Sequence, residues 1–147
     1  MIERLENVGV VVEDLDAAVA FFVGLGMVLE GTAPVEGSWV DRVVGIDGLK
    51  LDVAMVRTPD GHGRLELMRF RAPVAVDCRP DAPVYALGLR RVLFGVTDLD
   101  GVVSDLRARG VQLMGEVVQY EDSHKFCYVR GPEGIIVAFA ERLEQLG

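Results

Sequence analysis

The length and acidic balance of this chain exclude several classes of function. A formal net charge of −8 at pH 7 opposes binding to a phosphate backbone, and no basic block is present that would bind an anionic membrane surface. The 147 residues, half of them hydrophobic and about a quarter charged, suit one globular domain. We therefore expect no nucleic-acid partner and no membrane partner.

Cysteine usage and the N-terminal residues favour the cytoplasm. Cys78 and Cys127 are the only cysteines, and neither belongs to a paired motif, so we expect free thiols rather than a disulfide. Residues 1–7 lack the apolar stretch of a signal peptide, and no apolar run reaches membrane-spanning length. These features predict a cytoplasmic chain.

The first half of the chain predicts a strand, a helix and then further strands. Residues 8–12 form an apolar run typical of a buried strand, and Asp14 is placed to cap a helix that Gly24 and Gly26 end. Further strands are expected over residues 27–30, 39–46, 51–57 and 65–70, with a loop over residues 34–38.

After a proline-containing linker at residues 71–86, the same pattern begins again. A strand is expected over residues 91–96, followed by a helix that Asp98 caps and Gly110 ends. Further strands are expected over residues 111–118, 124–130 and 134–140, with a turn at residues 131–134.

The two halves form an internal repeat. Residues 7–27 align with residues 91–111 without a gap, so that the Asp-Leu-Asp sequence at 14–16 recurs at 98–100. Because strand, cap and helix end stay in phase, duplication explains the pattern better than the general likeness of any two strand–helix units. We therefore predict a single domain, residues 1–147, of two modules at 1–70 and 87–147.

These motifs resemble the vicinal oxygen chelate superfamily, which includes glyoxalase I, extradiol dioxygenases and bleomycin resistance proteins. The matching segments are residues 8–16, 65–67, 109–111 and 131–134, so the resemblance covers nearly the whole chain. It implies an α+β fold in which two βαβββ modules form curved mixed sheets around one cavity. It also implies a homodimer, by analogy alone. Function does not follow, because the same scaffold hosts unrelated chemistries.

Metalloenzymes of that superfamily hold a divalent metal in the cavity with four residues, and this chain keeps one of the four. The resemblance places Asn7, Glu66, Arg91 and Ala138 at the ligand positions. Of these, only Glu66 retains the ligand type, since arginine has a fixed positive charge and no lone pair, and alanine has no donor. We therefore predict no metal site and no cofactor. A metal site rebuilt with His62 or His124 is the less favoured alternative.

Glu66 and Arg91 are the candidate catalytic residues, and both also belong to the candidate ligand-binding set. Leu65 and Leu67 occupy one face of their strand, which turns Glu66 toward the cavity. Glu66 is interpreted as a general base or as the ion-pair partner of Arg91. Arg91 is interpreted as that partner or as the anchor of a ligand anion. If the repeat is in phase, we expect the two side chains within salt-bridge distance.

Asn7, Trp39 and Tyr120 complete the candidate ligand-binding set. Asn7 either orients a ligand or satisfies nearby backbone groups. Trp39 and Tyr120 either wall a pocket or belong to the core. His62, His124 and Arg90 are expected at the surface, and Cys127 is expected to be buried.

Three functions stay open. The favoured one is a glyoxalase- or bleomycin-resistance-like protein that binds a small organic molecule without a metal, because three ligand positions have changed while the fold signals remain. The second is a metal-independent lyase or isomerase in which Glu66 transfers a proton and Arg91 stabilises an oxyanion. The third is a metal-dependent glyoxalase, epimerase or dioxygenase with relocated ligands.

Overall fold

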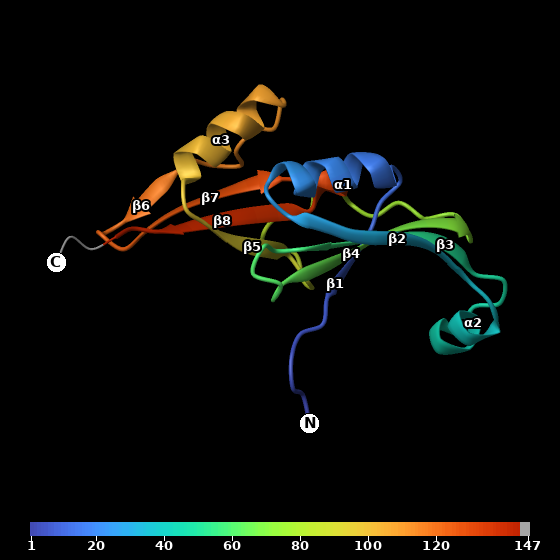
Figure 1. Ribbon diagram of the computed structural model, residues 1–147. Helices are drawn as coiled ribbons and strands as arrows, with labels where there is room; N and C mark the ends of the chain where they lie inside the picture. Colours follow the sequence, from blue (N-terminus) through green and yellow to red (C-terminus); the bar gives the residue numbers. More distant parts are fainter. Residues whose placement is uncertain (145–147) are drawn as a thin grey trace. The chain divides into compact units, whose positions relative to one another are not determined.

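The computed structural model describes residues 1–144, which form two compact units that divide between Cys78 and Arg79. Each unit is a four-stranded mixed sheet with a helix packed on one face (Figure 1). This is the α+β arrangement expected from the sequence. No helix among the described residues is long and apolar enough to cross a membrane.

The first unit has the strand order β1-β4-β3-β2, with β1 parallel to β4 and the other neighbours antiparallel. Its elements are β1 (Val8–Val11), α1 (Leu15–Gly24), β2 (Val28–Glu36), α2 (Ser38–Val44), β3 (Lys50–Arg57) and β4 (Arg64–Ala72). Helix α1 packs on β3 and β4.

The second unit repeats this topology in the order β5-β8-β7-β6, with β5 parallel to β8. Its elements are β5 (Arg91–Val96), α3 (Leu99–Ala108), β6 (Val118–Tyr120), β7 (His124–Arg130), a 3-10 turn η1 (Pro132–Gly134) and β8 (Ile136–Arg142). Equivalent strands occupy equivalent places in the two sheets, which agrees with the internal repeat.

The two predicted helix caps are confirmed. The Asp14 carboxylate accepts a hydrogen bond from the Ala17 amide (2.9 Å), and the Asp98 carboxylate accepts one from the Gly101 amide (3.1 Å). Each acid satisfies an amide that has no partner inside its helix, and its negative charge suits the helix N-terminus. The repeated Asp-Leu-Asp sequence therefore begins both long helices.

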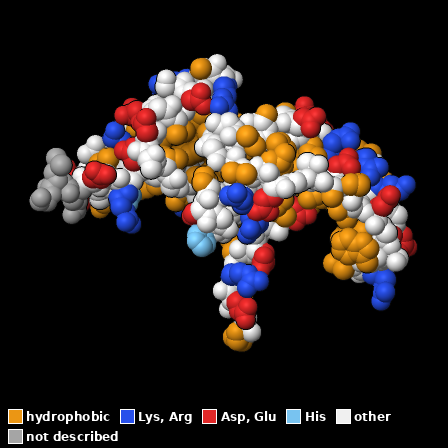
Figure 2. Space-filling model, viewed as in Figure 1, with side chains coloured by type: hydrophobic (Ala, Val, Ile, Leu, Met, Phe, Trp, Pro, Cys, Tyr) orange, Lys and Arg blue, Asp and Glu red, His pale blue; other side chains and the backbone are white. Residues whose placement is uncertain are grey.

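The strand predicted at residues 39–46 is wrong, because α2 occupies most of this segment. Val40 is buried against Leu49 and Leu51, whereas Trp39 and Val43 are 62% and 77% exposed. The valine-rich composition favours a strand locally, but a strand here would bury no continuous face, and packing of Val40 outweighs that preference. Figure 2 shows hydrophobic side chains gathered over α2 on the outside of this unit.

Two further segments differ from the sequence prediction. Strand β2 continues through the expected loop at residues 34–38 as far as Glu36, and it tolerates Pro34 because it is an edge strand. The strand expected over residues 111–118 is reduced to a single bridge between Leu113 and Val129, before the short edge strand β6.

Substitution of Gly134 tests the packing of the linker on the second unit. Gly134 has φ +75°, and a Cβ there would overlap the carbonyl oxygen of Pro80, whereas Gly110 has φ +83° and open space around it. Gly110→Ala should cost about 1–2 kcal/mol for the left-handed backbone alone. Gly134→Ala should cost distinctly more, because the overlap adds to the same strain. Urea unfolding measures both, and equal losses would contradict the contact with Pro80.

Candidate functional site

Glu66 lies on β4, on the face opposite α1. Its neighbours Leu65 and Leu67 are 3% and 0% exposed on the helix side, while Glu66 is half-buried on the other side. The register aligns Glu66 with Gly9 on β1 and with Met55 on β3. Within the described part of its unit, the Glu66 carboxylate has no hydrogen-bond or ion-pair partner. The face that carries Glu66 therefore leaves this carboxylate available.

Helix α2 covers one end of the Glu66 face with apolar side chains. On this face, Leu51 of β3 aligns with Phe70 of β4, which lies four residues along the strand from Glu66. The cluster at this end consists of Val40, Leu49 and Leu51, with Val35, Val53, Met68 and Phe70 packed against them. The part of the face near Glu66 therefore borders a buried apolar cluster.

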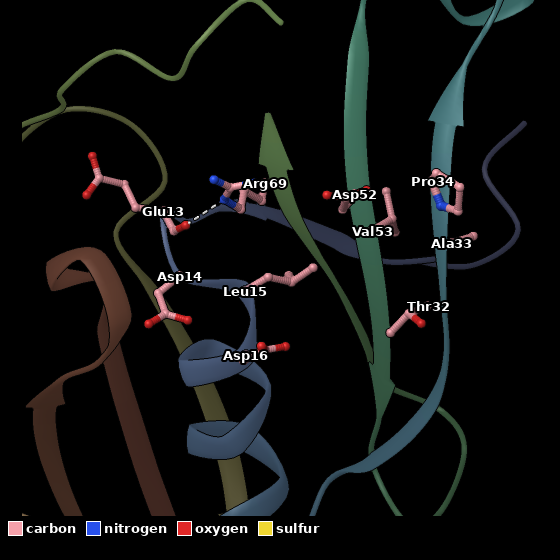
Figure 3. Close-up of a pocket in the computed structure, with 10 residues that line it drawn as sticks. All are labelled: Glu13, Asp14, Leu15, Asp16, Thr32, Ala33, Pro34, Asp52, Val53 and Arg69. Carbon is pink, nitrogen blue, oxygen red and sulfur yellow. Dashed lines mark hydrogen bonds between the residues drawn. The ribbon is translucent and has the colours of Figure 1, made fainter. Parts of the chain in front are cut away.

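An open groove of about 680 Å³ lies beside the N-terminus of α1 (Figure 3). Its polar groups already hold the fold: the Arg69 Nε donates to the Glu13 carbonyl oxygen (3.0 Å), Asp14 caps α1, and Asp52 forms an ion pair with Arg71 (3.3 Å). The residues lining it are Glu13, Asp14, Leu15, Asp16, Thr32, Ala33, Pro34, Asp52, Val53 and Arg69. Because Glu66 is not among them, this groove is separate from the predicted site.

Arg91 begins β5 in the second unit, and its guanidinium carbon lies 5.7 Å from the centre of the Tyr128 ring. That distance is within cation–π range. Tyr128 is on β7, and β8 runs between β5 and β7 with Ala138 beside Tyr128. A methyl group at position 138 leaves room for the arginine to cross β8. Glu66 and Arg91 belong to different units, so their ion pair stays a prediction.

An aromatic row shares the face that carries Arg91. His124, Phe126 and Tyr128 point to this side of β7, and the His124 and Phe126 rings stack with centres 5.6 Å apart. Tyr120 on β6 pairs with His124 and extends the row. All four side chains are half-buried or exposed. Rings in such a row offer an apolar wall to a planar molecule.

We call this surface the Arg91 face. It is the side of the second sheet opposite α3, since Lys125 and Glu141 on the other side contact α3 residues Asp100 and Leu99. By register, its strand residues are Arg91, Leu93, Gly95, Val118, Tyr120, His124, Phe126, Tyr128, Arg130, Ile136, Ala138, Ala140 and Arg142.

The Arg91 face carries positive charge in a chain whose net charge is −8. Its strand residues include three arginines and a histidine but no carboxylate. The Arg130 guanidinium is already bound to the carbonyl oxygens of Ala82 (2.8 Å) and Gly134 (3.0 Å). Arg91, by contrast, donates no hydrogen bond to any described residue of its unit. Within its own unit, the donors of Arg91 are therefore available to an anion.

The other predicted residues are spread over both units. Asn7 is half-buried immediately before β1, in the first unit. Trp39 lies on α2, in the segment that was expected to be a strand. Tyr120 is 61% exposed. The surface position predicted for Arg90 is wrong in part, because its Nε is buried and has no hydrogen-bond partner among the described residues.

His62 lies at the surface and Cys127 lies in the core. His62 is exposed in the turn between β3 and β4, and its backbone amide donates a hydrogen bond to the Asp60 carboxylate (3.0 Å). The Thr58 hydroxyl donates a second hydrogen bond to the same carboxylate. These two hydrogen bonds, the one from Thr58 first, lower the pKa of Asp60. Cys127 is buried, as predicted, and burial raises the pKa of its thiol. The Cys127 thiol therefore stays protonated at neutral pH.

The donor set does not fit the metal that the superfamily resemblance implies. Within each of the two units, over residues 1–78 and 79–144, no three His, Cys, Asp or Glu side chains gather closely enough to hold a metal ion. Ala138 is 0% exposed and offers no donor, and the glutamate of β8, Glu141, faces α3 instead. Its Oε1 accepts a hydrogen bond from the Leu99 amide (2.8 Å), so it reinforces the start of that helix.

Sequence reasoning missed Phe126 and Tyr128. The available signal was the alternation within residues 124–130, where His124, Phe126 and Tyr128 interleave with Lys125 and Cys127. A period of two assigns the rings to one face and the small or charged groups to the other. Which neighbours those rings meet depends on the order of the strands, which that pattern does not contain.

Comparison with known proteins identifies the family. A model of the glyoxalase/bleomycin resistance protein/dioxygenase superfamily matches residues 6–128. A glyoxalase family protein from Bacillus cereus is 49% identical, with a TM-score of 0.94 over 98% of this chain and 97% of that one. The chain therefore belongs to the glyoxalase/bleomycin resistance protein/dioxygenase superfamily. No curated protein matches this sequence.

More distant structures share the fold alone. One is an antibiotic-binding protein from Streptomyces, 21% identical with a TM-score of 0.59 over 96% of this chain and 97% of that one. Another is the trypanothione-dependent glyoxalase I of Leishmania major, 17% identical with a TM-score of 0.67 over 95% of this chain and 87% of that one. At these identities the likeness shows the shared fold and nothing about what this chain binds.

Substitution of Glu141 tests its structural role. Glu141→Ala should destabilise the protein by about 1.5–3 kcal/mol, because the half-buried Leu99 amide loses a charged acceptor. Glu144→Ala removes the same charge from an exposed position nearby and should change stability by less than about 0.5 kcal/mol. Urea unfolding of both variants gives the comparison. Equal stabilities would show that Glu141 does not support α3.

Proposed function

We propose that this protein binds a small organic molecule on the Arg91 face and does so without a metal. The observation that carries the proposal is the aromatic row of β7 beside small residues: Phe126 pairs with Ala140, which pairs with Gly95. Small side chains next to half-buried rings leave room for a planar ligand. The antibiotic-binding neighbour from Streptomyces is a precedent for binding on this fold.

Metal independence is part of the proposal, and the residues at the superfamily's ligand positions support it. Arg91 would repel a cation, and Ala138 offers no donor. Asn7 could supply only a neutral amide oxygen. Glu66 alone would hold a divalent ion weakly, since tight sites combine several donors.

A second candidate function is a metal-independent lyase or isomerase. The observation that favours it is Glu66, whose half-buried carboxylate lacks a partner within the described part of its unit. Such a carboxylate could accept a proton from a bound substrate. Arg91 would then stabilise the negative charge that develops on the substrate oxygen.

Screening the purified protein tests the proposal. We expect no stoichiometric zinc, iron, manganese or nickel by elemental analysis, and no rise in Tm when these ions are added. Some members of a panel of aromatic compounds and acyl-CoA thioesters should raise the Tm, because they bind the folded state. Phe126→Ala should abolish that rise, while Phe21→Ala, which removes a half-buried ring from α1, should keep it.

Two results would contradict the proposal: about one tightly bound metal ion per chain, or no stabilising compound in the panel. Turnover of a stabilising compound that is lost in Glu66→Gln would instead support the second candidate. Binding without turnover supports the first.

We also propose a homodimer. Helix α2 supports this, because Trp39, Val43 and Val44 are 62%, 77% and 51% exposed on one short helix. Light scattering should give twice the 16.0 kDa of one chain, and Val43→Asp should lower the mass toward one chain. Val76→Asp, at a position 90% exposed outside α2, serves as the control and should remain dimeric. A monomer mass for the unmodified protein at micromolar concentration would refute the dimer.

The cytoplasm is the compartment that we propose. Cys78 is exposed and Cys127 is buried, and both are free thiols. An exposed free thiol is better preserved in a reducing compartment than in an oxidising one.

A further inference from the structure

We infer that the ligand of the Arg91 face is a planar aromatic carboxylate, with its carboxylate on the Arg91 guanidinium and its ring beside Phe126. This inference rests on the proposed function, since it names the chemical class of the molecule bound at the same site. The charge of the face, the space beside Phe126 and the separation between the two features carry it.

The charge selects an anion. The Arg91 face holds no carboxylate on its strands, although acidic residues outnumber basic ones in the chain by 23 to 15. Arg91 is exposed, and its donors have no protein acceptor among the described residues of the second unit. A guanidinium presents paired N–H groups in a plane, which matches the two oxygens of a carboxylate.

The position of Arg91 is held by Tyr128. The guanidinium lies 5.7 Å from the ring centre, so the ring restricts the arginine without occupying its hydrogen-bond donors. Ala138, beside Tyr128 on β8, is 0% exposed, as expected if the arginine side chain crosses above it. A restrained guanidinium loses less conformational entropy when it binds an anion.

The space for an aromatic ring lies two residues along the strands from the row that contains Ala138 and Tyr128. Gly95, Ala140 and Phe126 pair across β5, β8 and β7 and form a shelf. A Cβ built at Gly95 meets no atom within 4 Å, so the shelf is open above β5. Phe126 is half-buried and stacks on His124, which fixes its ring as the wall of the shelf.

The separation of these features sets the size of the ligand. The shelf and the row that contains Ala138 and Tyr128 are two residues apart along each strand, which is about 6.6 Å. This spacing suits one aromatic ring whose carboxylate reaches the guanidinium directly. A ligand of this shape would bury its ring on the shelf and pair its charge at Arg91.

The experiment is a titration of the full chain, followed by amide NMR, with three probes at neutral pH. Benzoate carries both ring and charge, benzamide keeps the ring without the charge, and cyclohexanecarboxylate keeps the charge without a planar ring. We expect benzoate to bind at least about tenfold more tightly than either of the others. The shifted amides should include Gly95, Phe126 and Ala140.

Variants locate the two halves of the site. Arg91→Gln should weaken benzoate binding by about 10- to 100-fold, because a charged hydrogen bond is lost. Arg107→Gln removes the same charge from an exposed position of α3, on the opposite side of the sheet, and should change the affinity less than about threefold. A Cβ at Gly95 meets no atom within 4 Å, so we expect Gly95→Leu to fold normally and yet to block the ring.

The outcomes separate this inference from the proposed function. Equal affinity for benzoate and benzamide, or for benzoate and cyclohexanecarboxylate, would overturn the aromatic carboxylate while leaving small-molecule binding intact. Unchanged benzoate affinity in Arg91→Gln, or amide shifts confined to the first unit, would overturn it as well. If, in addition, no compound of the thermal-shift panel binds, the proposed function is contradicted together with this inference.

Discussion

Alternation of side chains across each sheet is the constraint on which the rest of this structure depends. One face of each sheet must bury its side chains under a helix, as Leu65 and Leu67 do under α1 and Val137 and Phe139 do in the second unit. The opposite face is not packed under that helix, so its side chains can contact a ligand or a substrate. Glu66 in the first unit and Arg91 in the second belong to these opposite faces because each strand has a period of two.

Interactions between residues close together in the sequence were sufficient to predict much of the fold. Asp14 and Asp98 were identifiable as caps because the amides that they satisfy lie three residues away in the sequence. Residues 39–46 were not identifiable as a helix, because the decisive contact joins Val40 to Leu49 and Leu51 across a turn. Strand β2 likewise passes Pro34 only because the strand order leaves it at an edge, which is information about the whole sheet.

The residues of the candidate site also divide into those that the sequence identifies and those whose contacts depend on the order of the strands. Arg91 was identifiable from the repeat, since it occupies the position of Asn7 in the second module. Its contact with Tyr128 was not, because it depends on β8 lying between β5 and β7. Sequence reasoning selected Trp39 and Tyr120 by residue type. The structure joins only Tyr120 to the aromatic row of β7, through its pairing with His124.

The side chains at positions 91 and 138 depend on each other physically. A glutamate at position 138 would stand beside Tyr128, where the guanidinium of Arg91 lies, and the two charges would pair. Alanine at 138 removes that acceptor and leaves space for the arginine to cross β8. Alanine at 138 and arginine at 91 together suit an anion better than a cation at this position, in line with the proposed binding site. Both residues matter, because a glutamate at 138 would neutralise Arg91, and without Arg91 the face would lose the guanidinium that has no acceptor among the described residues of its unit.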